Sequence, residues 1–164
     1  MALTVLPLAG EIVPASKWQD LLNERFPLPA LKTADQDVGP SNVTLQNITQ
    51  ASVAMAANAT YRFALALQYS TNGTADIKIG FTGPAGFTMD YITVGSNAAA
   101  VTNFGVGIQT TVVDFGGNVT SAFLYGTVVT TNAGTLQLQA AQNTSNASST
   151  LVSAGTLLEL VRIA

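Results

Sequence analysis

The sequence contains no cysteine and no histidine. Their absence excludes disulfide frameworks, thiolate nucleophiles, imidazole bases and the zinc sites that use these ligands. Charge is also scarce, because Asp, Glu, Lys and Arg make up 9% of the chain, against about 25% in an average soluble domain. The six Lys and Arg residues are scattered and form no basic stripe, so we expect no nucleic-acid partner.

Long apolar runs are missing as well. No segment reaches the roughly 18 to 20 apolar residues that a membrane-spanning helix requires, so no membrane partner is expected. The first ten residues carry no basic residue before a short apolar run that Pro7 interrupts, which is atypical of a signal peptide. The length of 164 residues suits one soluble domain with an appended arm.

The charged residues that are present do not form a catalytic pattern. Asp90 and Asp114 are expected next to loops, and Glu159 alternates outward on the last expected strand. Asp35 and Asp37 have the spacing of two calcium ligands, but the glycine and the distal glutamate of a calcium loop are missing. We therefore expect no catalytic, cofactor-binding or metal-binding residues, no cofactor and no enzymatic activity.

The first 40 residues differ from the rest of the chain, because eight of the charged residues lie there. Ser16 and Gln19 form a capping-box pattern that predicts a short helix near residues 16–25. A helix of two or three turns is not stable alone, so it packs either on its own domain or on a partner protein. We assign residues 1–40 to an N-terminal arm and residues 41–164 to a β domain. The candidate anchor residues of the arm are Trp18, Leu21, Leu22 and Phe26.

Beyond the arm the pattern predicts strands. Bulky side chains alternate with small or polar ones over residues 61–69, as expected for a strand with one buried face. Asn72–Gly73 follows, and this dipeptide predicts a tight hairpin to a strand over residues 75–82. A loop is expected over residues 95–107. Further strands are expected over residues 87–94, 106–115, 119–131, 135–143 and 157–163.

Between Asp90 and Glu159 the only charged residue is Asp114. The interval is nevertheless too rich in Thr, Ser, Asn, Gln and Gly to be a membrane span. Strands with so little charge are expected to have faces that another protein surface covers. Short strands joined by turns, without crossover helices, predict an all-β fold, an antiparallel jelly-roll sandwich.

Seven asparagines begin an Asn-x-Ser/Thr triplet: Asn42, Asn47, Asn58, Asn72, Asn118, Asn143 and Asn146. In a secreted eukaryotic protein these residues would be glycosylation acceptors. The alternative, which we favour, is that the asparagines form turns that lead into strands.

Four segments, residues 61–69, 75–86, 134–145 and 155–164, together resemble a recurrent pattern in virion proteins of tailed bacteriophages that infect actinobacteria. The resemblance extends over about residues 18–164. It implies a small head-decoration or minor capsid protein whose jelly roll is of the tumour-necrosis-factor and C1q type, commonly trimeric. Leu157 and Glu159 depart from the pattern, which more often has an aromatic and a basic residue there. The resemblance transfers no catalytic residues.

The sequence therefore favours a non-enzymatic structural protein on the surface of a phage head. Its arm would attach to the major capsid protein or another virion protein, and its β domain would project as a homotrimer. Tyr61, Phe63, Phe123 and Tyr125 are candidates for the domain core or the trimer seam, and periodicity alone does not separate these two places. The alternative is a tail or baseplate adhesin that binds host surface glycan through loops such as residues 95–104 and 143–149.

Overall fold

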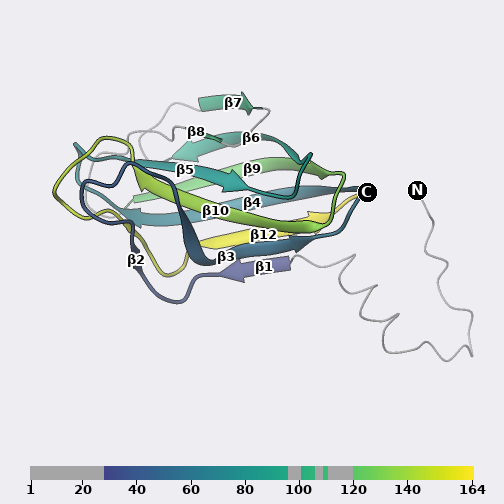
Figure 1. The fold of residues 1–164 in the computed structure, drawn as a ribbon, viewed down its shortest axis with the longest axis horizontal. Coiled ribbons are helices and arrows are strands. Elements are labelled where there is room, and N and C mark those ends of the chain that lie inside the picture. The colour runs from purple at the N-terminus through teal and green to yellow at the C-terminus, as the bar shows by residue number, and fades with distance from the viewer. Residues whose placement is uncertain (1–27, 96–100, 106–108, 111–119) are drawn as a thin grey trace, which may run out of the picture.

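The alternating pattern over residues 61–69 lies in strand β4 (Ala59–Ser70), which has neighbours on both sides in the larger of two antiparallel sheets (Figure 1). The computed structural model describes residues 28–95, 101–105, 109–110 and 120–164. Within them the chain is all-β, as predicted, and the sheets pack face to face as a sandwich. No helix in these ranges has the length and hydropathy needed to cross a membrane. The expected helix near residues 16–25, its four anchor residues and Asp114 lie outside the described residues.

The two sheets contain all of the described strands. The larger has the order β1-β12-β4-β9-β6-β7, and β11 pairs with both β4 and β2 at one end of it. Its remaining bounds are β1 Leu28–Leu31, β2 Gln36–Asp37, β6 Thr88–Gly95, β7 Val101–Gly105, β9 Thr120–Thr130, β11 Leu151–Val152 and β12 Leu157–Arg162. The smaller sheet has the order β3-β10-β5-β8, with bounds β3 Gln46–Met55, β10 Gly134–Gln142, β5 Ile77–Thr82 and β8 Gln109–Thr110.

The hairpin predicted at Asn72–Gly73 is wrong, because β4 and β5 belong to different sheets. The side-chain oxygen of Asn72 accepts hydrogen bonds from the backbone N–H groups of Thr74 at 3.0 Å and Ala75 at 2.8 Å. Asp76 then has a positive φ of 49°. This longer turn directs the chain into the opposite layer, whereas a two-residue hairpin would have kept it in one sheet.

Asparagine turns of this kind recur in the loops. Asn42 and Asn146, like Asn72, each accept a hydrogen bond from the backbone N–H of the Ser or Thr two residues further on, at 3.0 and 2.8 Å. The three residues therefore have the turn role that the sequence favoured for the Asn-x-Ser/Thr triplets.

Two other expectations differ from the structure. The interval 95–107 was expected to be a loop, but β7 lies within it and pairs with β6. An edge strand is held by backbone hydrogen bonds to one neighbour, so it needs little side-chain alternation. Residues 28–40, which we assigned to the arm, contain β1 and β2 and thus belong to the larger sheet. Pro29 is tolerated in β1 because this strand lies at the sheet edge.

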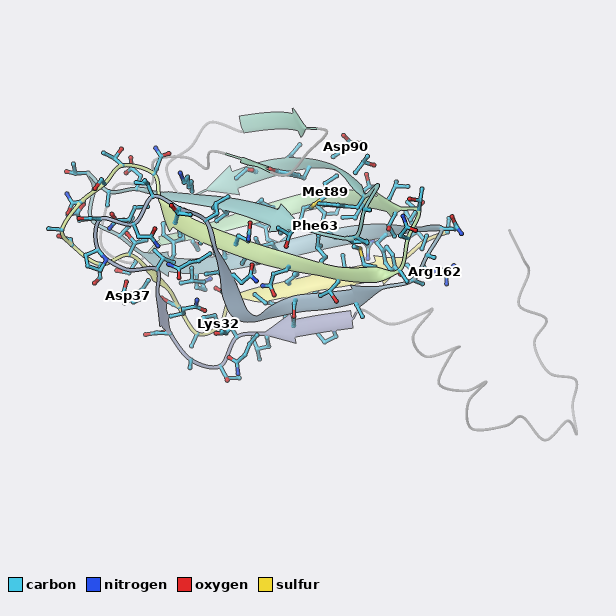
Figure 2. All side chains as sticks on the ribbon, in the orientation of Figure 1. Lys32, Asp37, Phe63, Met89, Asp90 and Arg162 are labelled. Atoms are coloured by element: carbon cyan, nitrogen blue, oxygen red, sulfur yellow. The ribbon has the colours of Figure 1, made fainter. Side chains whose placement is uncertain are left out.

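Three aromatic rings connect the two sheets in the core. Phe63 of β4 and Tyr91 of β6 come from the larger sheet, and Phe81 of β5 comes from the smaller one. Each ring meets the other two edge to face, with centroids 5.9 to 6.3 Å apart. Gly126 of β9 lies in register between Phe63 and Tyr91, so the two rings meet over a position without a side chain. Phe63 and Met89, both labelled in Figure 2, are buried members of this core.

Burial also affects the ionisation of Tyr91. The side chain is almost fully buried among apolar neighbours. This desolvation disfavours the phenolate and raises the pKa of Tyr91 to about 12 from an ordinary value of 10.0. Tyr91 is therefore a neutral member of the core at physiological pH.

A bulge interrupts the pairing of β3 with β10. The pairing of β10 with β3 jumps from Gln137 opposite Ser52 to Gln139 opposite Asn47. The side-chain amide of Gln137 donates hydrogen bonds to the carbonyl groups of Ile48 at 2.8 Å and Ala51 at 3.1 Å. One side chain thus compensates for backbone partners that the bulge removes from the ladder.

Lys32 connects this bulge to the end of β1. Its side chain is buried, and its ammonium group lies 3.5 Å from the carbonyl oxygen and 3.4 Å from the hydroxyl of Thr49. Desolvation lowers the pKa of Lys32 below 10.5, and the carboxylate of Asp35 partly opposes the shift. The hydrogen bonds of the ammonium to Thr49 are long and neutral, and Asp35 acts on it through its charge.

Candidate protein-protein interface

Strand β9 turns its bulkier side chains away from the core. Phe123 and Tyr125 are each 46% exposed on the outer face of the larger sheet, and Val129 is exposed beside them. The smaller alternate residues Ala122 and Leu124 are buried between the sheets. This arrangement is unusual because a strand normally buries its larger apolar side chains.

Neighbouring strands extend this surface on both sides of β9. Ile92 of β6 lies opposite Tyr125 and is exposed. On the other side, Ala64 and Ala66 of β4 lie opposite Tyr125 and Phe123. Because the alanines are short, side chains from β4 do not cover the two rings. We define the apolar face by these residues and their outward neighbours on β12: Ala64, Ala66, Ile92, Phe123, Tyr125, Val129, Leu157 and Val161.

Three charged side chains lie on the same outer surface. Arg62 of β4 and Asp90 of β6 lie on either side of Thr127 of β9, and Glu159 of β12 lies opposite Ala64. None of the three forms an ion pair or a side-chain hydrogen bond with another described residue. Figure 2 shows Asp90 at the periphery of the sandwich. Asp90 is inside a strand, so the prediction that it adjoins a loop is wrong.

The outer face of the smaller sheet is polar by contrast. On β10 its outward residues are Thr135, Gln137 and Gln139. The amides of the two glutamines find partners within the chain: Gln137 donates to backbone carbonyl groups of β3, and Gln139 donates to the side-chain oxygen of Asn47 at 2.9 Å. Two outer faces of one sandwich therefore differ in chemistry, and among the described side chains the exposed aromatic residues typical of a protein interface lie on the larger sheet.

The predicted site residues separate into two groups. Tyr61 and Phe63 are buried in the core, where the hydroxyl of Tyr61 accepts a hydrogen bond from the N–H of Ala56 at 2.7 Å. Phe123 and Tyr125 lie on the apolar face. Trp18, Leu21, Leu22 and Phe26 fall outside the described residues.

Sequence reasoning missed Ile92 and Val129. Val129 continues the alternation of Phe123 and Tyr125, and that pattern was visible in the sequence. Ile92 joins the surface only because β6 pairs with β9 in a register that puts it opposite Tyr125. No local signal gives such a register between strands distant in sequence.

The described residues show no clustering of groups suited to metal chemistry. None of the described His, Cys, Asp and Glu side chains forms a group of three or more that could hold a metal ion. Asp35 and Asp37, whose spacing resembled part of a calcium loop, each accept a backbone hydrogen bond instead. The donors are the N–H of Ala154 at 2.8 Å and the N–H of Gly39 at 2.7 Å.

Comparisons with protein-family models and with curated proteins found no match. Among solved structures, the chain is similar to a chain in the structure of the infectious bursal disease virus Gx strain. The sequence identity is 13% and the TM-score is 0.21, and the alignment covers 85% of this chain and 43% of that one. The chain thus spans less than half the length of that protein, and a TM-score this low carries no argument.

Proposed function

We propose that this protein is a non-enzymatic structural protein of a bacteriophage virion, and that copies of it assemble through the apolar face. The observation that carries the proposal is the exposure of Phe123 and Tyr125 beside Ile92 on one sheet surface. Roughly 70 to 115 Å² of each ring is accessible, given the areas that aromatic residues bury. Covering that area contributes roughly 2 to 3 kcal/mol per ring before the costs of association.

We propose that this assembly is a homotrimer on the surface of the phage head, as the resemblance of the sequence to phage virion proteins implies. In this arrangement the three apolar faces turn toward a common axis, and the arms reach the capsid. Three arms on one trimer raise avidity for a symmetric capsid site, because the second and third contacts are intramolecular. Trp18, Leu21, Leu22 and Phe26 would make these contacts with the major capsid protein or another virion protein.

Sedimentation analysis tests the assembly step. We expect the wild-type protein to be a trimer at micromolar concentration, and Phe123→Ser to weaken association by about tenfold or more. Val43→Ser is the matched control, since Val43 is also an exposed apolar residue but lies in the loop before β3. A wild-type protein that stays monomeric, or equal effects of the two substitutions, would contradict the role of the apolar face.

Particle incorporation tests the arm separately. The larger sheet begins at Leu28, so a deletion of residues 1–27 leaves every described strand intact. We expect this deletion to preserve the oligomer and to abolish incorporation into phage particles. Trp18→Ala and Phe26→Ala in the full chain should reduce incorporation in the same direction. Normal incorporation of the deletion variant would show that attachment lies elsewhere in the chain.

A host glycan is the second candidate ligand of the apolar face. Phe123 and Tyr125 lie two residues apart on one strand, about 6.7 Å along it, and Arg62 and Asp90 supply polar groups on either side of the next outward residue, Thr127. A tail or baseplate adhesin would use the rings to stack sugars. Binding to isolated host cell wall, lost in Tyr125→Ala and kept in the arm deletion, would favour the adhesin.

A further inference from the structure

The apolar face has one cation, Arg62, and two carboxylates, Asp90 and Glu159, and none of them forms an ion pair or a side-chain hydrogen bond with another described residue. Arg62 has an exposed side chain on β4, Asp90 has an exposed side chain on β6, and β9 separates their strands. Two strand spacings amount to about 9.5 Å. The intervening Thr127 cannot neutralise either charge.

An apolar contact that covers such charges must pair them. An unpaired charge removed from water opposes association strongly, whereas a close pair across an interface offsets much of that cost. Arg62 has Val161 as its neighbour on β12 and Thr127 as its neighbour on β9, with Tyr125 diagonal to it. Glu159 is its diagonal neighbour on β12 but forms no ion pair with it, which leaves the guanidinium able to pair with a carboxylate of a neighbouring copy when the face is covered.

The strand order determines which carboxylate can reach it. In a cyclic trimer each copy has two neighbours. If the apolar faces turn toward the axis, the part of a face on one side of β9 contacts one neighbour and the part on the other side contacts the second. The β6 half of one copy then meets the β4 half of the next, because these strands lie on opposite sides of β9. Asp90 approaches from β6, whereas Glu159 lies on β12, on the same half of the face as Arg62.

We propose that Arg62 of one copy pairs with Asp90 of the neighbouring copy, and that this pair sets the register in which the apolar faces meet. The inference rests on the proposed self-association and adds its specificity. Apolar contacts are non-directional, so Phe123 and Tyr125 supply attraction without fixing orientation. A single pair per contact excludes the arrangements that bring two arginines or two aspartates together.

Charge reversal in the full chain tests the pair. We expect Arg62→Asp and Asp90→Arg each to weaken association by about tenfold or more, because each variant places like charges across the contact. The double variant R62D/D90R restores opposite charges and should return to within about threefold of wild type. Lys78→Asp, on the polar face of the smaller sheet, is the matched control for Arg62 and should leave association unchanged. Thr135→Arg, on the polar outer face of the smaller sheet, is the control for the arginine introduced at Asp90 and should not weaken association.

Several results would overturn the inference. If the single reversals have no effect, or if their effects simply add in the double variant, Arg62 and Asp90 do not pair. Salt gives an independent measurement on the unmodified protein, since raising it from about 50 to about 500 mM should weaken association. An association constant that does not fall with salt would also count against the pair. If Phe123→Ser dissociates the oligomer but charge reversals do not, only this inference fails, whereas a monomeric wild-type protein removes the proposed function as well.

Discussion

Replacing Gly126 with alanine should destabilise the sandwich at its centre. A Cβ atom at this position would lie 2.0 Å from the carbonyl oxygen of Asp90 and 2.7 Å from the Cα atom of Tyr91. Both contacts are with the backbone of β6, so no side-chain rotation relieves them. Strands β6 and β9 must therefore move apart by about 1 Å or more. Hydrogen-bonded strands normally lie about 4.7 to 4.9 Å apart, so this movement weakens the hydrogen bonds between them.

The cost follows from what the separation disrupts. Overpacking a core by one methyl group costs about 1 to 3 kcal/mol. Weakening one backbone hydrogen bond adds about 1 kcal/mol, and displacing the Tyr91 ring from Phe63 adds roughly another. The alanine recovers about 0.4 to 1 kcal/mol through the reduced entropy of the unfolded chain. We therefore expect Gly126→Ala to lower the free energy of unfolding by about 3 kcal/mol, a large share of the stability of an ordinary domain.

Urea denaturation at one fixed protein concentration measures this effect, because self-association would otherwise change the apparent stability. Gly39→Ala is the control. Gly39 has a φ of +85°, but a Cβ atom there would meet only the Asn42 side chain at 3.7 Å. Its substitution should cost about 1 to 2 kcal/mol from backbone strain alone. The reasoning is refuted if Gly126→Ala costs no more than Gly39→Ala, or if it stabilises the protein.

Three further changes test the core and the bulge. Gln137→Leu removes the donor to the carbonyl groups of Ile48 and Ala51 and should cost about 1 to 3 kcal/mol by urea denaturation, with Gln139→Leu as a milder control. Tyr91 holds its proton more tightly in the folded state, so stability should decline as pH rises from 10.0 through about 12. In Tyr91→Phe the free energy of unfolding should fall less over this pH range, and a pH profile equal to that of the wild type would contradict the burial argument. Lys32→Met should raise stability at neutral pH by roughly 1 kcal/mol, because it removes a desolvated charge. The folded-state pKa of Lys32 lies below 10.5, so wild-type stability rises with pH in the interval just below 10.5, and the gain should shrink there.

The strands were the part of the fold that sequence predicted best. Period-two alternation is a local property of side chains, and it placed β4, β6, β9, β10 and β12 within a few residues of their observed bounds. The short strands β2 and β11 each span two residues, which is too few for a periodic signal. Strand β8 lies within the strand predicted over residues 106–115, and the rest of that range is outside the described residues. The sequence predicted the turn at Asn72–Gly73 correctly, but it did not predict that the following strand, β5, belongs to the other sheet. A local turn signal is the same whether the next strand pairs beside the last or crosses to the other layer.

Sequence alone determined that this chain forms antiparallel strands with unusually little charge, since both properties depend only on which residues follow one another. It also gave two alternating sets of side chains on each strand. Only the tertiary structure decided which set faces the core. In β4 the bulky set with Phe63 is buried, whereas in β9 the bulky set with Phe123 and Tyr125 is exposed. The physical reason is the register in which β9 pairs with β4 and β6. This register puts Gly126, a member of the smaller set, between Phe63 and Tyr91, where only a residue without a side chain fits, so the smaller set faces the core.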